Sequence, residues 1–272
     1  IRGPYVSREL DSLINEAKTL KEQGIKEIIL TAQDTTRYGL DKGENQFAVL
    51  LEEIANLGFD WVRIMYAYPS TLTDDVINVM ERYENICKYI DMPIQHSENK
   101  MLSLMNRHYT KEDMINVINR IRSSKYDWAL RTTLMCGFPG ETDKEFKGML
   151  RFIDEYKFDN LGVFAFSLEE GTPAVDLPNK CRQSTGQNRA DSVMLRQGEI
   201  AHSFNSRRIG KTYKTLVEGF DEEQNMYFGR TEFLAPEVDG RVYFSGENVK
   251  IGEFTQVYID EAFGYDFFGR VL

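Results

Sequence analysis

Hydrophobic and polar positions follow two alternating periods along residues 1–170. Short, continuous apolar runs are typical of parallel strands covered on both faces, and they predict strands over residues 25–32, 61–68, 87–94, 129–136 and 161–167. Between these runs, apolar residues recur every three or four positions, which predicts helices over residues 8–24, 47–58, 110–121 and 142–153, with a last helix over 189–208. Thr142 and Glu145 have the spacing of a capping box.

This alternation of strands and helices predicts an α/β fold with a parallel sheet. Five visible strands are too few for a closed eight-stranded barrel, so we expect a partial, open barrel with room for a further strand upstream of residue 1.

Beyond residue 209 the pattern changes to short aromatic and β-branched runs separated by Gly, Asp and Asn. It predicts a small five-stranded antiparallel β-barrel with strands over residues 211–220, 225–231, 240–245, 253–263 and 265–272. We therefore expect two domains, residues 1–209 and 210–272.

Composition narrows the class of protein. No apolar run reaches the roughly 18–20 residues that span a bilayer, so we expect no membrane segment. The three cysteines, Cys87, Cys136 and Cys181, have the spacing of neither a disulfide framework nor a zinc site, and their low, odd number suits the reducing cytoplasm. The net charge of −10 argues against a general affinity for nucleic acid. Because the chain begins at Ile1 rather than Met, we expect that an upstream segment has been removed or is not shown.

The ends of the predicted strands carry the candidate site, because ligands of parallel β/α folds bind at the carboxyl ends of the strands. The residues that follow the five strands and could line a site are Gln33, Asp34, Tyr66, Gln95, His96, Gly137, Phe138, Pro139, Gly140 and Glu170. A plain structural interpretation stands beside each: a turn for the glycines, a helix cap for Asp34, a satisfied polar group for His96. Arg131 lies inside a buried strand and needs a partner, which a ligand carboxylate or Glu170 could provide.

Two common barrel chemistries can be weighed against this set. No lysine lies at a strand end, which argues against a Schiff-base aldolase. Asp34, His96 and Glu170 could hold a metal ion, so a metal-dependent hydrolase stays an alternative, although no His-x-His pair supports it. Neither chemistry explains the Gly-Phe-Pro-Gly turn.

Six segments, in order and spread over nearly the whole chain, resemble the radical S-adenosylmethionine (SAM) methylthiotransferases. They are "RGPYVSRE", "LTAQDTTRYG", "CKYIDMPIQHSENKMLSLMNR", "RTTLMCGFPGET", "FDNLGVFAFSLEEGTPA" and the closing "LVEG…GRT…APEVDG". The resemblance implies a partial (β/α)6 barrel followed by a TRAM domain. It is strongest to members that add a methylthio group to the β-carbon of an aspartate in ribosomal small-subunit protein twelve. The tRNA-modifying members, the alternative, usually carry Gly-Gln-Asn where this chain has residues 33–36.

The resemblance also implies the cofactors: SAM, and two 4Fe-4S clusters in the full-length protein. The cluster-binding Cys-x-x-x-Cys-x-x-Cys loop is expected upstream of Arg2, so this chain is expected to contain no cluster ligands and to be inactive alone. In the chemistry implied, SAM gives a 5′-deoxyadenosyl radical that removes hydrogen from carbon, sulfur is inserted, and a second SAM supplies the methyl group.

Roles for the candidate residues follow from the resemblance. Gly137 to Gly140 would bring backbone close to the adenosyl group, and Arg131 would pair with the methionine carboxylate or orient an acid. Gln33 and Gln95 would hydrogen-bond the ribose or the methionine. The residues expected to face the reacting space are Asp34, His96 and Glu170. Glu98 and Asn99 depart from the family's Ser-Asp pair, so neither is given a ligand role.

The charge of the small barrel bears on its partner. Residues 210–272 contain six Lys and Arg against twelve Asp and Glu, a net charge of −6. Such a surface attracts a basic ribosomal protein and repels phosphate backbones, so tRNA is the less favoured substrate. The resemblance adds a reductant such as flavodoxin or ferredoxin as a partner. A non-catalytic ribosome-binding module stays a further alternative.

Overall fold

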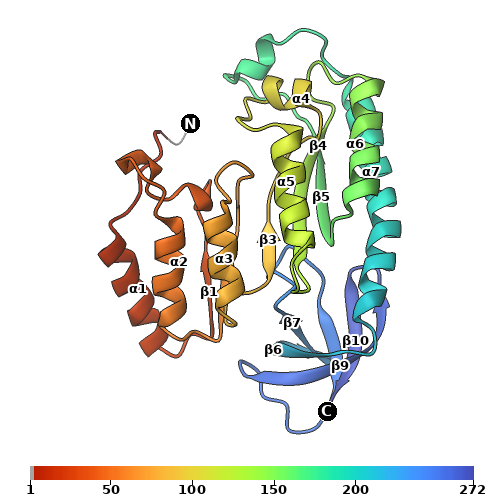
Figure 1. Cartoon of the computed structure of the whole chain (residues 1–272). Helices are drawn as coiled ribbons and strands as arrows, with labels where there is room; N and C mark the ends of the chain where they lie inside the picture. Colours follow the sequence, from red (N-terminus) through yellow and green to blue (C-terminus); the bar gives the residue numbers. More distant parts are fainter. Residues whose placement is uncertain (1–2) are drawn as a thin grey trace. The chain divides into compact units, whose positions relative to one another are not determined.

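The computed structural model describes residues 3–272, so Arg2, at the start of the first family-like segment, lies outside the described residues. The chain forms two compact units (Figure 1). The first comprises residues up to 94 and residues 108–128, and the second comprises residues 95–107 and 129–272. None of the helices in residues 3–272 is long and apolar enough to cross a membrane.

The first unit alternates strands and helices as the sequence predicts. Its elements are α1 (Leu10–Glu22), β1 (Glu27–Leu30), η1 (Thr35–Arg37), η2 (Leu40–Lys42), α2 (Phe47–Asn56), β2 (Trp61–Ile64), α3 (Asp74–Arg82), β3 (Tyr89–Asp91) and α5 (Lys111–Arg122). Strands β1 and β2 pair in parallel, with Glu27 opposite Trp61 and Leu30 opposite Ile64. The sequence analysis did not predict α3, although its buried Val76, Ile77, Val79 and Met80 recur at the three- and four-residue spacing of one helix face.

Strand β1 departs from the expectation that both faces of each strand are covered. All four of its residues are only half-buried. A cavity of about 390 Å³ lies against it, lined by apolar side chains that include Leu13, Leu20, Ile28, Leu30, Phe47 and Leu50. The same pair of strands buries a charge: Arg63 of β2 is fully buried, and its Nε lies 2.7 Å from Oε1 of Glu27.

The second unit continues the alternation. It contains α4 (Asn99–Leu104), β4 (Ala129–Cys136), α6 (Asp143–Tyr156), β5 (Asn160–Ala165), η3 (Pro173–Asp176), α7 (Gln183–Asn205) and η4 (Ser206–Arg208). Strands β4 and β5 pair in parallel, with Arg131 opposite Asn160 and Cys136 opposite Ala165. The capping box of Thr142 and Glu145 is confirmed at the start of α6. Helix α7 begins six residues before the predicted start, at Gln183.

The predicted five-stranded barrel is present and closed. Its strands are β6 (Thr212–Asp221), β7 (Met226–Thr231), β8 (Val242–Ser245), β9 (Phe254–Phe263) and β10 (Asp266–Val271), in the order β10-β8-β7-β6-β9. The prediction of a fully antiparallel barrel is wrong at one seam, where β10 and β8 run parallel. The reason is geometric: directions cannot alternate all the way around a closed ring that has an odd number of strands.

Buried charges join this barrel to the end of α7 and the start of β4 and β5. Asp159 is 1% exposed and accepts hydrogen bonds from Arg207 (2.5 Å) and Arg208 (2.8 Å). The guanidinium of Arg208, itself 1% exposed, lies 4.0 Å from the ring centroid of Phe233 in the barrel domain. Asn205 of α7 also donates to the carbonyl of Gly264. The barrel is therefore held by specific contacts, and this explains why it shares one compact unit with β4, β5 and α7.

Candidate functional site

The turn after β4, Gly137 to Gly140, has a backbone that glycine alone adopts readily. Gly137 has φ +81° and Gly140 has φ +88°. A Cβ atom on Gly137 would lie 2.7 Å from the Cα of Gly186 in α7, and one on Gly140 would lie 2.8 Å from Cδ1 of Leu104 in α4. Packing against the α7 backbone therefore requires glycine at position 137, whereas at position 140, where the neighbour is the end of a flexible leucine, the positive φ favours glycine. This is a cause that the sequence interpretation, which considered only turn chemistry and a ligand, did not include.

Hydrogen bonds within the protein fix the shape of this turn. The amide of Gly137 donates to Oε2 of Glu141 (2.9 Å), and the amide of Gly140 donates to the carbonyl of Asn179 (3.0 Å). The ring of Phe138 packs edge to face on Phe166, with 4.8 Å between centroids. The turn is thus formed before any ligand arrives.

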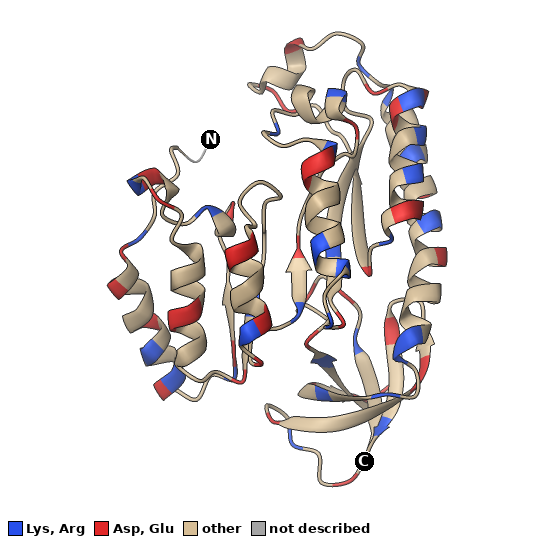
Figure 2. Ribbon diagram, in the orientation of Figure 1, with Lys and Arg blue, Asp and Glu red and all other residues tan. Residues whose placement is uncertain are grey.

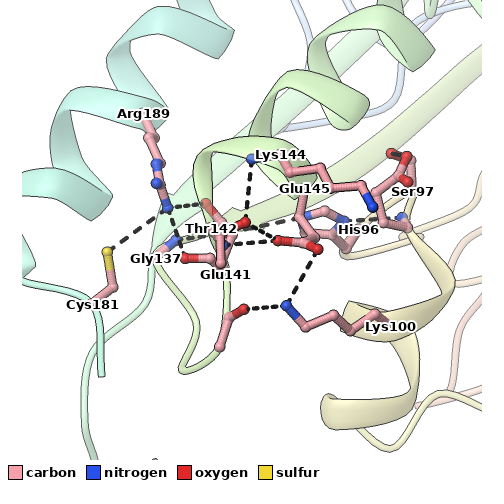
Figure 3. A network of polar contacts seen from close by, with 12 residues as sticks. His96, Ser97, Lys100, Gly137, Glu141, Thr142, Lys144, Glu145, Cys181 and Arg189 are labelled. Carbon is pink, nitrogen blue, oxygen red and sulfur yellow. Dashed lines mark hydrogen bonds and ion pairs between the residues drawn. The ribbon is translucent and has the colours of Figure 1, made fainter. Parts of the chain in front are cut away.

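A network of buried charges lies directly behind the turn (Figure 3). The Glu141 side chain is fully buried, and its Oε1 accepts a hydrogen bond from Nη1 of Arg189 at 2.8 Å. The other terminal nitrogen of Arg189 donates to Asp143 at 2.7 Å. Burial raises the pKa of Glu141, whereas the hydrogen bond from Gly137 and the charge of Arg189 oppose that rise.

His96 approaches the same carboxylate from the other side. Its Nδ1 accepts a hydrogen bond from the amide of Glu98 at 3.0 Å, which places the ring proton on Nε2 in the neutral form. Nε2 lies 3.8 Å from Oε2 of Glu141. Cys136, the last residue of β4, is fully buried, and burial raises the pKa of its thiol, so it remains an inert, packed thiol.

The first unit carries a second polar cluster, at the ends of β1 and β2. The carboxylate of Asp34 accepts hydrogen bonds from Thr36 (3.2 Å) and Thr71 (3.3 Å), and burial raises its pKa. The carbonyl of Tyr66, a half-exposed residue with φ +59°, accepts the amide of Thr35 at 3.1 Å. This unit therefore brings together the predicted Asp34 and Tyr66, with the exposed Gln33 beside them.

The remaining predicted residues differ in placement. Gln95, with φ +60°, exchanges backbone hydrogen bonds with the β4 strand through Thr133 and Met135, so it lies on the sheet beside His96. Glu170 is exposed, in the loop after β5. Arg131 lies near the amino end of β4, away from the turn, and its Nε is 3.4 Å from the fully buried carboxylate of Asp239.

Two sequence expectations are corrected here. The partner of Arg131 is a carboxylate of the barrel domain, not Glu170, because the third residue of β4 lies at the opposite end of the strand from the turn. The metal site of Asp34, His96 and Glu170 is not formed: no group of three His, Cys, Asp or Glu side chains in residues 3–272 could hold a metal ion.

Sequence reasoning missed two residues that the site depends on. Glu141 directly follows the glycine turn, and a buried acid could have been suspected from its position there. Arg189 lies 48 residues further along the chain, and nothing in the sequence links it to the turn.

Comparison with known protein families identifies the class to which this chain belongs. The radical SAM superfamily model matches residues 1–153, more than half of the chain, and a TRAM domain model matches residues 209–272. The chain therefore belongs to the radical SAM superfamily.

Within the superfamily, the chain is most informatively compared with individual curated proteins. The chain is 49% identical to the ribosomal protein uS12 methylthiotransferase RimO of Clostridioides difficile and 44% identical to that of Acetivibrio thermocellus, each over the whole of this chain. It spans 62% and 61% of the length of these two relatives. Among solved structures, coproporphyrinogen III oxidase (HemN) of Escherichia coli, a radical SAM enzyme, shares the fold at 14% identity, with a TM-score of 0.55 over 72% of this chain and 48% of that one.

Proposed function

We propose that this chain is the catalytic core and TRAM domain of a radical SAM methylthiotransferase. Its substrate is ribosomal protein uS12, in which it modifies the β-carbon of an aspartate. The observation that carries the proposal is identity of 40–49% along the whole chain to proteins named as uS12 methylthiotransferases. The working site is in the cytoplasm, where the ribosomal substrate is made.

The residues of the turn fit the adenosyl half of SAM. Met135 and Phe164 are neighbours in the register of β4 and β5, just before the strands end, and Phe164 is 62% exposed. An exposed aromatic ring beside a rigid turn suits the packing of a purine. We assign Gly137 to Gly140 and these two strand residues to the adenosyl group. Gln95 is assigned to its polar side, and the fully buried His96 to the support of Glu141 behind the turn. The cluster of Gln33, Asp34 and Tyr66 in the other unit is a second candidate for contacts with SAM.

Bound SAM, with an iron–sulfur cluster as electron donor, supplies the radical chemistry of this superfamily. The described cysteines fit no cluster: Cys87 and Cys136 are buried in or beside strands, and they do not form a ligand set with Cys181. We therefore place the ligands of both clusters in the Cys-x-x-x-Cys-x-x-Cys loop and N-terminal domain expected upstream. The contribution of this chain is to bind and orient SAM and to dock the substrate.

The TRAM domain is the proposed docking surface for uS12. Figure 2 shows both signs of charge on the barrel, and acidic residues outnumber basic ones by twelve to six over residues 210–272. A basic ribosomal protein is attracted by that excess, whereas tRNA is repelled. A flavodoxin- or ferredoxin-type reductant completes the proposed set of partners.

The test uses the full-length protein, reconstituted anaerobically with iron and sulfide and supplied with SAM and a reductant. Purified uS12 and total tRNA are offered in separate reactions, and mass spectrometry records addition of a methylthio group. The proposal expects the addition on an aspartate of uS12 and none on tRNA. Modification of tRNA alone would assign the chain to the other branch of the family, and failure to assemble any iron–sulfur cluster would contradict the class of reaction.

A further inference from the structure

The shape of the glycine turn depends on the buried carboxylate of Glu141, which needs a compensating positive charge. The Glu141 side chain is fully buried and holds the amide of Gly137 at 2.9 Å through Oε2. A buried carboxylate is costly unless a positive charge and hydrogen bonds compensate it. The compensating charge nearest to it within hydrogen-bond distance is Arg189.

Arg189 is held in a fixed orientation by several contacts at once. Its Nη1 donates to Oε1 of Glu141 at 2.8 Å and contacts the main-chain carbonyl of Glu141 at 3.3 Å. Its Nη2 donates to Asp143 at 2.7 Å, and its guanidinium lies 5.3 Å from the ring centroid of Phe146. The Arg189 side chain is only 9% exposed, so it faces protein rather than solvent. Its two terminal nitrogens donate hydrogen bonds to the carboxylates of Glu141 and Asp143.

The same face of α7 touches the turn a second time. Gly186 precedes Arg189 by three residues, so the two lie on one side of the helix. A Cβ on Gly186 would lie 3.4 Å from the Cα of Gly137 and from the carbonyl oxygen of Cys136. The first turns of α7 therefore contact the turn sterically at Gly137, through Gly186, and electrostatically at Glu141, through Arg189. Figure 3 shows the second of these contacts.

We propose that Arg189 of α7 is a positioning residue for SAM binding, acting through Glu141 on the Gly137 to Gly140 turn. The inference rests on the proposed function, which assigns the turn to the adenosyl group. Arg189 does not touch the ligand in this account. It holds the Glu141 side chain in place through the hydrogen bond to Oε1, and Glu141 in turn holds the Gly137 amide through Oε2.

The first experiment measures hydrogen exchange at the Gly137 amide, which needs neither SAM nor a cluster. It compares wild type with Arg189→Met, Arg189→Lys and Glu141→Gln. Arg196→Met is the control, because Arg196 lies two helical turns further along α7 in an exposed ion pair with Asp154. We expect exchange at least about tenfold faster in Arg189→Met, an intermediate rate in Arg189→Lys, and no change in the control.

The second experiment measures SAM affinity of the reconstituted full-length protein by calorimetry. Arg189→Met and Glu141→Gln are each expected to weaken binding by about tenfold to a hundredfold, because a displaced turn misplaces the ligand. If Arg189 acts through Glu141, the double variant is no weaker than the worse single variant. Additive losses would show that Arg189 contacts SAM independently, and that result would overturn the proposal.

The outcomes separate this inference from the function itself. Unchanged exchange at Gly137 in a folded Arg189→Met protein overturns the positioning role. If that variant does not fold, Arg189→Lys, which keeps the positive charge, decides in its place: unchanged exchange there overturns the role and faster exchange supports it. A wild-type protein that binds no SAM contradicts the proposed function, and the exchange rates still decide whether Arg189 holds the turn.

Discussion

Replacing Asp159 with Asn tests whether the barrel domain is locked to the core by buried charge. The Asp159 carboxylate accepts hydrogen bonds from Arg207, Arg208 and the amide of Leu130, and it is 1% exposed. Asn keeps an oxygen for the Leu130 amide but removes the charge that Arg208 needs. The side chain of Arg207 is 28% exposed and can turn to solvent, whereas the side chain of Arg208 is buried and cannot.

The expected cost follows from removing the buried carboxylate that Arg207 and Arg208 share, because breaking a buried ion pair by replacing one partner costs about 3–5 kcal/mol. For a chain of this size, a loss of 3 kcal/mol lowers the melting temperature by roughly 6–12 °C. The matched control is Asp154→Asn, which breaks the exposed ion pair between Asp154 of α6 and Arg196 of α7 and is expected to cost at most about 1 kcal/mol.

Urea denaturation and calorimetry of this chain would measure both variants. A second pair of variants sharpens the test: Arg208→Met should be destabilised strongly, and adding Asp159→Leu should recover part of the loss, because the pair is then removed as a whole. Equal small shifts for Asp159→Asn and Asp154→Asn would refute the account, since burial would then make no difference.

Three further predictions concern the turn and its surroundings. Gly137→Ala should lower the free energy of unfolding by about 2 kcal/mol or more, because the backbone there is left-handed and the added Cβ would clash with α7. Gly186→Ala should be near neutral, and denaturation curves that rank the two variants the other way would contradict the packing argument. Hydrogen bonds from Thr142 hold the pKa of Glu145 at about 2, so the stability lost in Glu145→Gln should be full above pH 4.5 and vanish as pH falls toward 2; a pH-independent difference in denaturation midpoint would refute this. Arg131→Met should lower the melting temperature but leave SAM affinity of the full-length protein unchanged, and a calorimetric loss of affinity would restore Arg131 to the site.

Local patterns predicted the elements well because each depends on neighbouring residues. Strand β4 has the predicted bounds, and Thr142 caps α6 as its spacing indicates. The small barrel was also predicted. Its parallel pairing of β8 with β10 was not, because that pairing follows from closure of the ring and leaves no signal in the sequence of either strand.

The site was only partly predictable because its critical contacts join distant segments. Arg131 was a reasonable candidate, since a charge in a buried strand requires a partner. The partner is Asp239, more than a hundred residues away, and periodicity cannot reveal it. Arg189 and Glu141 are separated in the same way, whereas the glycine turn was visible because its own sequence dictates its backbone.

The most direct measurement of the central claim is hydrogen exchange across the reconstituted full-length protein with and without SAM. The account predicts that SAM slows exchange in the segment 136–141 and leaves the strands β6 to β10 unchanged. Protection by SAM elsewhere in the chain, with none in segment 136–141, would contradict it.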